Sequence, residues 1–273
     1  MTATPATALT IAGSDSGGGA GIQADLRTFF ANGVHGLVAL TAVTVQNSLG
    51  VQGFTEIPVD VVTAQIKAVA SDMGVGAAKT GMLATADIIR AVAKTADEVH
   101  IGRDTGTPFV IDPVAASMTG HALLREDALE AIRTELFPRA TLVTPNLDEV
   151  RLLTGVDVTD AASQRLAAEA LLAFGPRWVL VKGGHMTGTD ECVDLLSDGR
   201  EFIELSGPRY ATENTHGGGD TLASAITASL AKGADVPTAV ADGKRFIERC
   251  VAESYRLGAG VGPVSPFWRL KGS

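Results

Sequence analysis

The sequence predicts an α/β fold in which a mostly parallel central sheet is flanked by helices in three layers. The first observation is that apolar runs of strand length alternate with stretches of helical periodicity from one end of the chain to the other. The second is the composition. Of 273 residues, 45% are hydrophobic, 19% are charged and 31 are glycine, which is typical of a globular α/β protein with many tight turns.

Six apolar runs predict the strands of the parallel sheet. They are Leu9–Ala12, Leu37–Val45, Ala77–Lys79, Phe109–Ile111, Thr141–Val143 and Trp178–Val181. Four helices show apolar residues at three- and four-residue spacing, and these stripes should pack on the sheet or on one another. The stripes are Ile22, Leu26, Phe29 and Phe30; Val62, Ile66, Val69 and Met73; Leu222, Ile226 and Leu230; and Val236, Val240, Ile247 and Val251.

Towards the C-terminal third the pattern of the strands changes. Cys192–Leu196 and Glu201–Leu205 flank the turn 197–200, which predicts an antiparallel hairpin. No low-complexity linker, composition break or internal repeat separates the parts of the chain. We therefore predict a single domain over residues 8–273, preceded by a flexible tail over residues 1–7.

Charge and composition exclude several classes of function. A formal net charge of -9 and a pI near 5.0 would repel phosphate backbones, so nucleic acid is not expected as a partner. No window approaches the roughly 20 apolar residues of a membrane span, and the first residues lack the pattern of a secretory signal. Cys192 and Cys250 make neither a disulfide framework nor a zinc site. These features predict a cytoplasmic enzyme that acts on small molecules away from the membrane.

The segment with the clearest chemistry is the glycine-rich loop Asn214–Thr221, which leads into an Ala-rich helix. Gly217, Gly218 and Gly219 let backbone N–H groups approach an anion, and the helix N-terminus adds partial positive charge. Asp220 follows in the first helical turn, where an acid alone would simply be favoured by the helix dipole. Beside an anion site, a carboxylate is also the group that accepts a proton from an attacking hydroxyl during phosphoryl transfer. We therefore predict that Asp220 is a general base.

Two other phosphate-binding motifs fail on their spacing. A Walker loop that ends in Lys79 and Thr80 would need glycines where Met73 and Ala78 stand. The first glycine loop, residues 13–21, does not match the dinucleotide fingerprint either. A dinucleotide-dependent oxidoreductase is therefore disfavoured.

Seven segments, in order along the chain, carry a resemblance to a known family. They are AGSDSGGGAGIQADLRTF (12–29), TAVTVQN (41–47), AAKTGML (77–83), DPV (112–114), TPNLDE (144–149), VKGGH (181–185) and NTHGGGDT (214–221). Together they resemble the hydroxymethylpyrimidine kinases of thiamine biosynthesis, in the ribokinase-like superfamily. The resemblance implies the ribokinase-like fold, a homodimer, and Mg²⁺-dependent transfer of the ATP γ-phosphoryl group to the pyrimidine alcohol and then to its monophosphate.

The resemblance places the pyrimidine among Gly13, Asp25, Gln46 and Met82. The Gln46 amide has donors and an acceptor that suit an aminopyrimidine edge, although a solvated side chain at the end of a strand would look the same in sequence. Asp25 lies on the inward face of its helix, so its carboxylate needs a partner such as a ligand hydroxyl. Met82 should pack against the ring.

For the nucleotide, the resemblance implies contacts from Asn146, Lys182 and Thr215. Lys182 follows a strand and precedes two glycines, where a point charge would neutralise phosphates. Asp112 and Glu149 stand at a strand end and a helix start, and such acids suit Mg²⁺, which keeps several of its waters. Asn146 could equally be a helix cap.

Asp220 departs from the many members of this family that carry Cys at the position, whereas pyridoxal kinases and sugar kinases of the superfamily carry Asp. Either residue can deprotonate an alcohol. A pyridoxine or pyridoxal kinase therefore remains the alternative, and a non-catalytic ligand-binding protein is disfavoured by a base beside an anion site. His216 is expected to shape its loop, and residues 115–120 are expected to form a lid.

Overall fold

The computed structural model describes residues 3–115, 126–184 and 191–270. They form two compact units, Met1–Leu83 with Tyr210–Ser273, and Ala84–Arg209. The single domain expected over residues 8–273 stays a prediction, and the lid expected at 115–120 lies outside the described residues except for its first position. No helix among the described residues is long and apolar enough to cross a membrane.

The sheet of the first unit has the strand order β3-β2-β1-β4. The strands are β1 (Thr7–Ser14), β2 (His35–Asn47), β3 (Gly50–Glu56) and β4 (Ala77–Thr80). β1 runs parallel to both β2 and β4, while β3 is antiparallel to β2. β1 pairs from Thr7, so the N-terminal tail is one residue shorter than predicted. All four residues of β4 are buried, because this strand is covered by helix.

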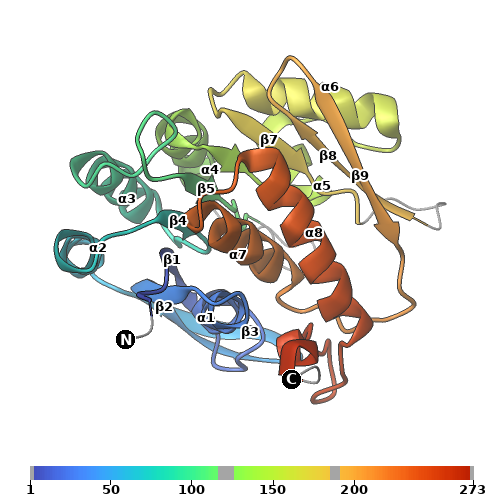
Figure 1. The fold of residues 1–273 in the computed structure, drawn as a ribbon, viewed down its shortest axis with the longest axis horizontal. Coiled ribbons are helices and arrows are strands. Elements are labelled where there is room, and N and C mark those ends of the chain that lie inside the picture. The colour runs from blue at the N-terminus through green and yellow to red at the C-terminus, as the bar shows by residue number, and fades with distance from the viewer. Residues whose placement is uncertain (1–2, 116–125, 185–190, 271–273) are drawn as a thin grey trace. The chain divides into compact units, whose positions relative to one another are not determined.

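Four α-helices and a short 3₁₀ helix complete the first unit. They are α1 (Gly21–Ala31), α2 (Val59–Asp72), α7 (Gly218–Ala231), α8 (Val236–Ala252) and η3 (Pro266–Leu270). α7 is the central helix, because it contacts α1, α8, β1 and β4 (Figure 1). Its residues 221–230 are all buried, and most of them are Ala, Ser or Thr, whose small side chains let neighbours approach from every side.

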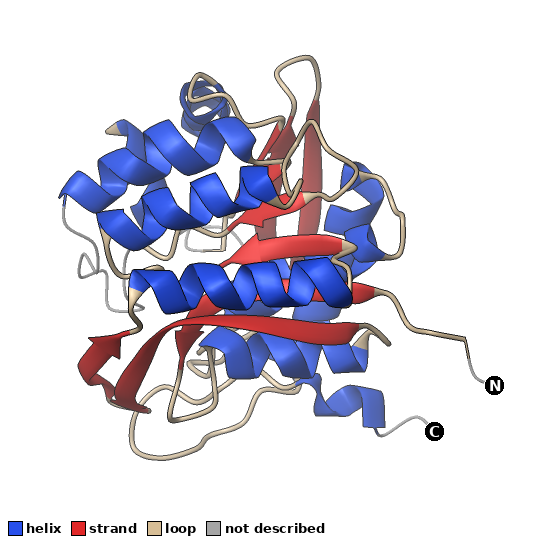
Figure 2. Cartoon of the chain, turned by 90° about the vertical axis from the view of Figure 1, so that its left-hand side faces the viewer, coloured by secondary structure: helices blue, strands red, loops and turns tan. Residues whose placement is uncertain are grey.

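The second unit holds five strands in the order β5-β6-β7-β8-β9. They are β5 (Phe109–Ile111), β6 (Leu142–Val143), β7 (Trp178–Val181), β8 (Glu191–Ser197) and β9 (Phe202–Pro208). The first three pair in parallel and the last two pairings are antiparallel. Helical segments precede β5, β6 and β7 along the chain, and Figure 2 shows helices and strands in separate colours. These helical segments are α3 (Ala86–Glu98), α4 (Glu126–Ala131), η1 (Ile132–Leu136), η2 (Phe137–Arg139), α5 (Leu147–Thr154) and α6 (Ala161–Leu172).

The predicted fold class is confirmed: the chain is α/β with mostly parallel strands, and β8 and β9 form the expected hairpin. The predicted bounds of β5 and β7 match the structure. One strand, β3, was not predicted. It lies at the edge of its sheet, and six of its seven residues are exposed, so it lacks the alternating apolar pattern that marks a half-buried strand.

Candidate active site

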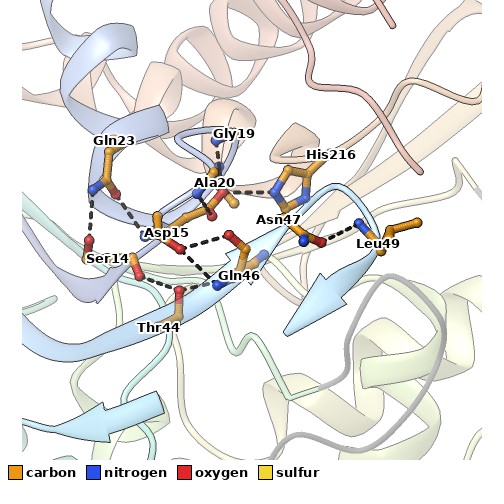
Figure 3. Close-up of polar contacts among 12 residues, drawn as sticks. Ser14, Asp15, Gly19, Ala20, Gln23, Thr44, Gln46, Asn47, Leu49 and His216 are labelled. Carbon is orange, nitrogen blue, oxygen red and sulfur yellow. Dashed lines mark hydrogen bonds and ion pairs between the residues drawn. The ribbon is translucent and has the colours of Figure 1, made fainter. Parts of the chain in front are cut away.

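The loop after β1 is organised by the carboxylate of Asp15. Its Oδ1 accepts a hydrogen bond from the Gly17 N–H at 2.8 Å, and its Oδ2 accepts from the N–H groups of Gly19 and Ala20 at 2.8 Å each (Figure 3). The His216 Nε2 lies 2.9 Å from the same Oδ2. Burial alone would raise the pKa of Asp15, but the hydrogen bonds from His216 and the backbone outweigh it and hold the pKa below its ordinary value.

The glycine loops at residues 13–21 and 214–221 therefore lie against each other in the first unit. A Cβ at Gly19 would overlap the His216 ring, and a Cβ at Gly217 would overlap the Gly19 carbonyl oxygen. Gly217 also has φ +74°, a conformation that side chains other than glycine rarely adopt. His216 was expected to shape its loop, and in the structure its imidazole connects the two loops by its contact with the Asp15 carboxylate.

The N-terminus of α7 carries the predicted base. Gly217 is the N-cap and provides no side-chain capping bond, and Asp220 lies in the first turn with its side chain 16% exposed. The Gly218 N–H already donates to the Thr215 carbonyl at 3.1 Å. The loop thus closes as a turn on itself, and the anion-binding role expected of the Gly217, Gly218 and Gly219 amides stays a prediction. The nucleotide contact of Thr215 stays a prediction as well.

A buried ion cluster lies next to Asp220. Lys79 and Asp25 are both 0% exposed, and the Lys79 Nζ lies 2.9 Å from the Asp25 Oδ1. Asp25 also accepts hydrogen bonds from the hydroxyls of Thr10 and Ser224, each at 2.6 Å. The Asp220 Oδ1 is 3.7 Å from the same ammonium.

This cluster gives Asp25 partners within the protein. Its carboxylate points inward as expected, its partners are a lysine and two hydroxyls, and its role toward the pyrimidine stays a prediction. Sequence reasoning missed Lys79 and considered it only in a failed Walker match. A lysine in the middle of the buried strand 77–80 was the available signal, because lysine is almost never fully buried without a partner.

The remaining residues predicted for the pyrimidine gather around the first glycine loop. A Cβ at Gly13 would lie 3.6 Å from the Met82 Sδ, so that sulfur lies close over the glycine. The half-buried Gln46 exchanges two backbone hydrogen bonds of 2.8 Å with the Ser16 hydroxyl, and its Oε1 accepts from Thr44 at 3.3 Å (Figure 3). The backbone of Gln46 is thus tied to the loop, and its amide NH₂ is the group that suits a ligand acceptor.

In the second unit, Asp112 and Lys182 form a pair at the ends of β5 and β7. The Asp112 Oδ1 lies 3.2 Å from the Lys182 Nζ and accepts a hydrogen bond from the Thr144 hydroxyl at 3.1 Å. Asp112 is 3% exposed, and the Lys182 side chain is 13% exposed. The structure therefore brings together the residue predicted for the phosphates and one of the two predicted for magnesium.

Glu149 and Asn146 form a capping box at the start of α5. The Asn146 Oδ1 accepts from the Glu149 N–H at 2.9 Å, and the Glu149 Oε2 accepts from the Asn146 N–H at 2.8 Å. The Glu149 Oε1 accepts from the Ala115 N–H at 3.2 Å. Burial raises the pKa of Glu149 to about 7, although Lys182 and these backbone bonds oppose the shift.

These acids fit magnesium to different degrees. Among the described residues, the hydrogen bonds of Asp112 go to its Oδ1, whereas both oxygens of Glu149 accept backbone N–H groups. Within the described ranges, no group of three or more His, Cys, Asp or Glu could hold a metal on its own. That suits Mg²⁺, which takes one or two carboxylates and completes its shell with water and substrate phosphates.

Comparison with known proteins decides the family. Residues 15–265 match the family model described as phosphomethylpyrimidine kinase. The chain belongs to this family. A hydroxymethylpyrimidine/phosphomethylpyrimidine kinase of Mycobacterium leprae is 56% identical over 97% of this chain and 95% of that protein. A protein of the same description from Streptomyces coelicolor is 54% identical over 98% of this chain and 96% of its own length.

Solved structures share the fold of this family member. A pyridoxal kinase of Bacillus subtilis in an ADP complex has a TM-score of 0.88 and 39% identity, covering 98% of this chain and all of that one. A phosphomethylpyrimidine kinase of Clostridium difficile has a TM-score of 0.78 and 36% identity, covering 89% and 97%. Both substrate names that the sequence left open therefore occur among its structural neighbours.

Proposed function

We propose that this phosphomethylpyrimidine kinase family member transfers the ATP γ-phosphoryl group to 4-amino-5-hydroxymethyl-2-methylpyrimidine, and then a second one to the monophosphate. The observation that carries the proposal is Asp220 in the first turn of α7, behind a glycine N-cap in the left-handed conformation. The relatives that are 54–56% identical over nearly the whole chain bear the name of this activity, which supports the choice of substrate.

In the first step Asp220 accepts the proton of the substrate hydroxymethyl group. As that O–H bond breaks, the oxygen forms a bond to the γ-phosphorus, and the bond from the γ-phosphorus to the bridging oxygen breaks with release of ADP. The positive end of α7 and the Gly219 amide face the charge on the transferring group. Gln46 holds the pyrimidine edge and Met82 packs on its ring.

The second step makes a different demand on the same residues. A phosphate monoester has a second pKa of about 6, so it is largely ionised at neutral pH and needs no base to become a nucleophile. Positioning carries this transfer. Asp220 is therefore important for the alcohol and much less important for the monophosphate.

ATP would be held in part by Lys182, Asn146 and Thr215, and Mg²⁺ by Asp112. When bound, Mg²⁺ supplies positive charge that neutralises the phosphate oxygens during transfer. Asp112 would hold the metal, and Lys182, which contacts the Asp112 carboxylate at 3.2 Å, would orient it and supply positive charge to the phosphates. Glu149 would support the metal indirectly, because both of its oxygens accept backbone N–H groups.

The alternative substrate is pyridoxal or pyridoxine. The 39% identity to a pyridoxal kinase structure and the acid at position 220 favour testing it. A coupled assay for ADP with the purified protein, Mg²⁺ and ATP should compare the hydroxymethylpyrimidine, its monophosphate and pyridoxal. We expect both pyrimidines to be phosphorylated with higher kcat/KM than pyridoxal. Preference for pyridoxal would replace the substrate assignment, and no ADP with any of the three would overturn the kinase proposal.

We further propose that the enzyme is a cytoplasmic homodimer. The family resemblance and the composition motivate this assignment. Light scattering on the eluting protein should give a mass of twice 28.1 kDa. A mass of a single chain at micromolar concentration would contradict it.

A further inference from the structure

We propose, on the basis of the proposed function, that Lys79 is a positioning residue that keeps the Asp220 carboxylate charged and oriented towards the substrate alcohol. Lys79 belongs to β4 and Asp220 to α7, and the two are 3.7 Å apart. Asp25 on α1 lies on the same ammonium at 2.9 Å. Three elements of the first unit thus converge on one buried cation.

The burial of Lys79 calls for a reason beyond stability. Removing an ammonium and a carboxylate from water costs several kcal/mol per ion, and buried ion pairs can often be replaced by apolar side chains without loss of stability. Lys79 has no exposed surface, and it lies in a strand whose other residues are Ala77, Ala78 and Thr80. Asp25 alone would balance its charge. The second carboxylate, Asp220, makes the cluster net negative, which stability alone does not require.

Hydrogen bonds to Asp25 hold its carboxylate in place, and that carboxylate in turn fixes the position of the Lys79 ammonium. The Thr10 hydroxyl donates to the Asp25 Oδ2 and the Ser224 hydroxyl to its Oδ1, each at 2.6 Å. Ser224 is four residues after Asp220 and therefore lies on the same face of α7. The helix that carries the base is thus joined to the counter-ion of Lys79, so the orientation of Asp220 and the place of the cation are set together.

The surroundings of Gly81 show that this cluster lies close to Met82, which is predicted to pack on the pyrimidine ring. A Cβ at position 81 would lie 3.6 Å from the Lys79 Nζ and 3.8 Å from the Asp220 Oδ1. The same atom would lie only 2.9 Å from the Ala12 Cβ, which leaves little room for a side chain. The next residue, Met82, lies over Gly13 in the pocket proposed for the pyrimidine. The ion pair is therefore adjacent to the place where the alcohol is expected.

The distances also suit a base. At 3.7 Å the Asp220 oxygen is attracted to the ammonium, and this distance is longer than that of an ordinary hydrogen bond. An opposite charge within about 4–6 Å favours the ionised carboxylate. Asp25 shares the same ammonium at the shorter distance of 2.9 Å.

Two other acids of the first unit have partners of their own. Asp15 after β1 is engaged with His216, and Asp242 on α8 accepts from Ser229 and pairs with Arg245. Among the described residues, the cation with an established contact to the Asp220 carboxylate is Lys79, at 3.7 Å.

A thiol in place of the carboxylate tests the charge effect without measuring activity. The Asp220→Cys protein is alkylated with iodoacetamide across a pH series, with mass spectrometry used to separate this site from Cys192 and Cys250. The same series is run with Lys79→Met and Asp25→Asn added, a pair that removes both buried charges together and so avoids leaving one uncompensated. We expect the thiol pKa to rise by about one unit when the ammonium is removed. Unchanged titration of the thiol would overturn the role of Lys79.

Adding Asp25→Asn alone to Asp220→Cys should shift the thiol pKa in the opposite direction. It therefore provides a second test that does not depend on the folding of the triple variant. In the Asp220→Cys background, Asp25→Asn alone removes the carboxylate that shares the Lys79 ammonium with position 220, so the thiol pKa should fall below that of Asp220→Cys itself. A rise would contradict the proposed sharing of Lys79 between the two acids. Circular dichroism and thermal unfolding of each variant establish that the fold is kept.

Kinetics then separate this proposal from the proposed function. In the protein that keeps Asp220, the double change Lys79→Met and Asp25→Asn should move the acid limb of the pH profile of kcat/KM for the alcohol to higher pH. The acid limb of the corresponding profile for the monophosphate should not move. If Asp220→Asn does not slow the alcohol step, Asp220 is not the base and the proposed mechanism fails. If Asp220→Asn slows that step but the Lys79 and Asp25 changes leave the pH profile unmoved, the base stands and the role of Lys79 is rejected.

Discussion

The N-termini of α5 and α7 both carry an acid at the third helical position, and the two acids have opposite environments. In α5, Glu149 turns back to its own N-cap, and Asn146 completes the capping box. In α7, Gly217 has no side chain with which to cap, and Asp220 points to a buried ammonium from another element. One helix start is capped by its own side chains, whereas the other has a glycine N-cap without a side-chain capping bond.

This difference shows how the same local sequence signal supports two roles. An acid in the first turn is favoured by the helix dipole in both helices. The Glu149 carboxylate is used up by backbone donors and is 3% exposed, whereas Asp220 is 16% exposed and has a long contact with its cation. A group that must exchange a proton with substrate cannot also be fully engaged in capping.

The largest effect should come from removing the predicted base at the start of α7. Asp220→Asn keeps the size of the side chain and should slow phosphorylation of the alcohol by about 10²–10⁴-fold, the usual contribution of general-base catalysis. Phosphorylation of the monophosphate should fall much less. Both rates are measured by ADP release on one preparation, so a damaged fold would reduce both equally. Equal large losses with an intact fold would assign Asp220 to phosphate or metal binding instead.

The glycine N-cap of α7 should be the next most sensitive position. Gly217→Ala adds a Cβ against the Gly19 carbonyl at a φ of +74°, and we expect a loss of at least about 2 kcal/mol in the free energy of unfolding. Gly218→Ala is the matched control, since its Cβ would meet only the Val264 Cγ1 at 3.9 Å. Urea denaturation of both variants measures the difference. Equal stability of the two would mean that the loop relaxes freely.

Glu149, at the N-terminus of α5, should make the free energy of unfolding depend on pH. The folded-state pKa of Glu149 is raised to about 7 from 4.5, so the native state keeps a proton that the unfolded chain has lost between these values. Stability should therefore fall as pH rises through this window, by up to about 1.4 kcal/mol per pH unit. Glu149→Gln can keep the capping box and should flatten this slope, as measured by urea denaturation in EDTA. A slope that survives in the variant would assign the effect to another group.

The two functions of Asn146 can be separated by a pair of substitutions. Asn146→Ala removes the cap and should cost about 1 kcal/mol in the free energy of unfolding. Asn146→Asp caps equally well but replaces the amide NH₂ with a carboxylate oxygen, so it should retain stability and raise the KM for ATP. An unchanged KM for ATP in the Asp variant would leave Asn146 with the capping role alone.

The smallest effect is expected at Gln46, away from both helix starts. Gln46→Ala removes hydrogen bonds that are made equally in the ground state and the transition state, so KM for the pyrimidine should rise about fivefold with little change in kcat. Steady-state kinetics at saturating ATP measure both constants. If KM is unchanged, the side chain serves only as a polar residue at the end of β2.

The sequence by itself determined the fold class, the positions of most strands along the chain and the glycine loop that carries the predicted base, because these depend on short-range patterns. Buried runs such as Phe109–Ile111 are continuous in apolar character, and the glycine loop with Asp220 is contiguous in the chain. Only the tertiary structure decided what each polar side chain contacts. The sequence suggested that the Asp25 carboxylate needs a partner such as a ligand hydroxyl. In the structure Lys79, which is 54 positions away, donates a hydrogen bond to it. Pairing between distant residues depends on how strands and helices pack, and local periodicity carries no information about the partner that packing brings.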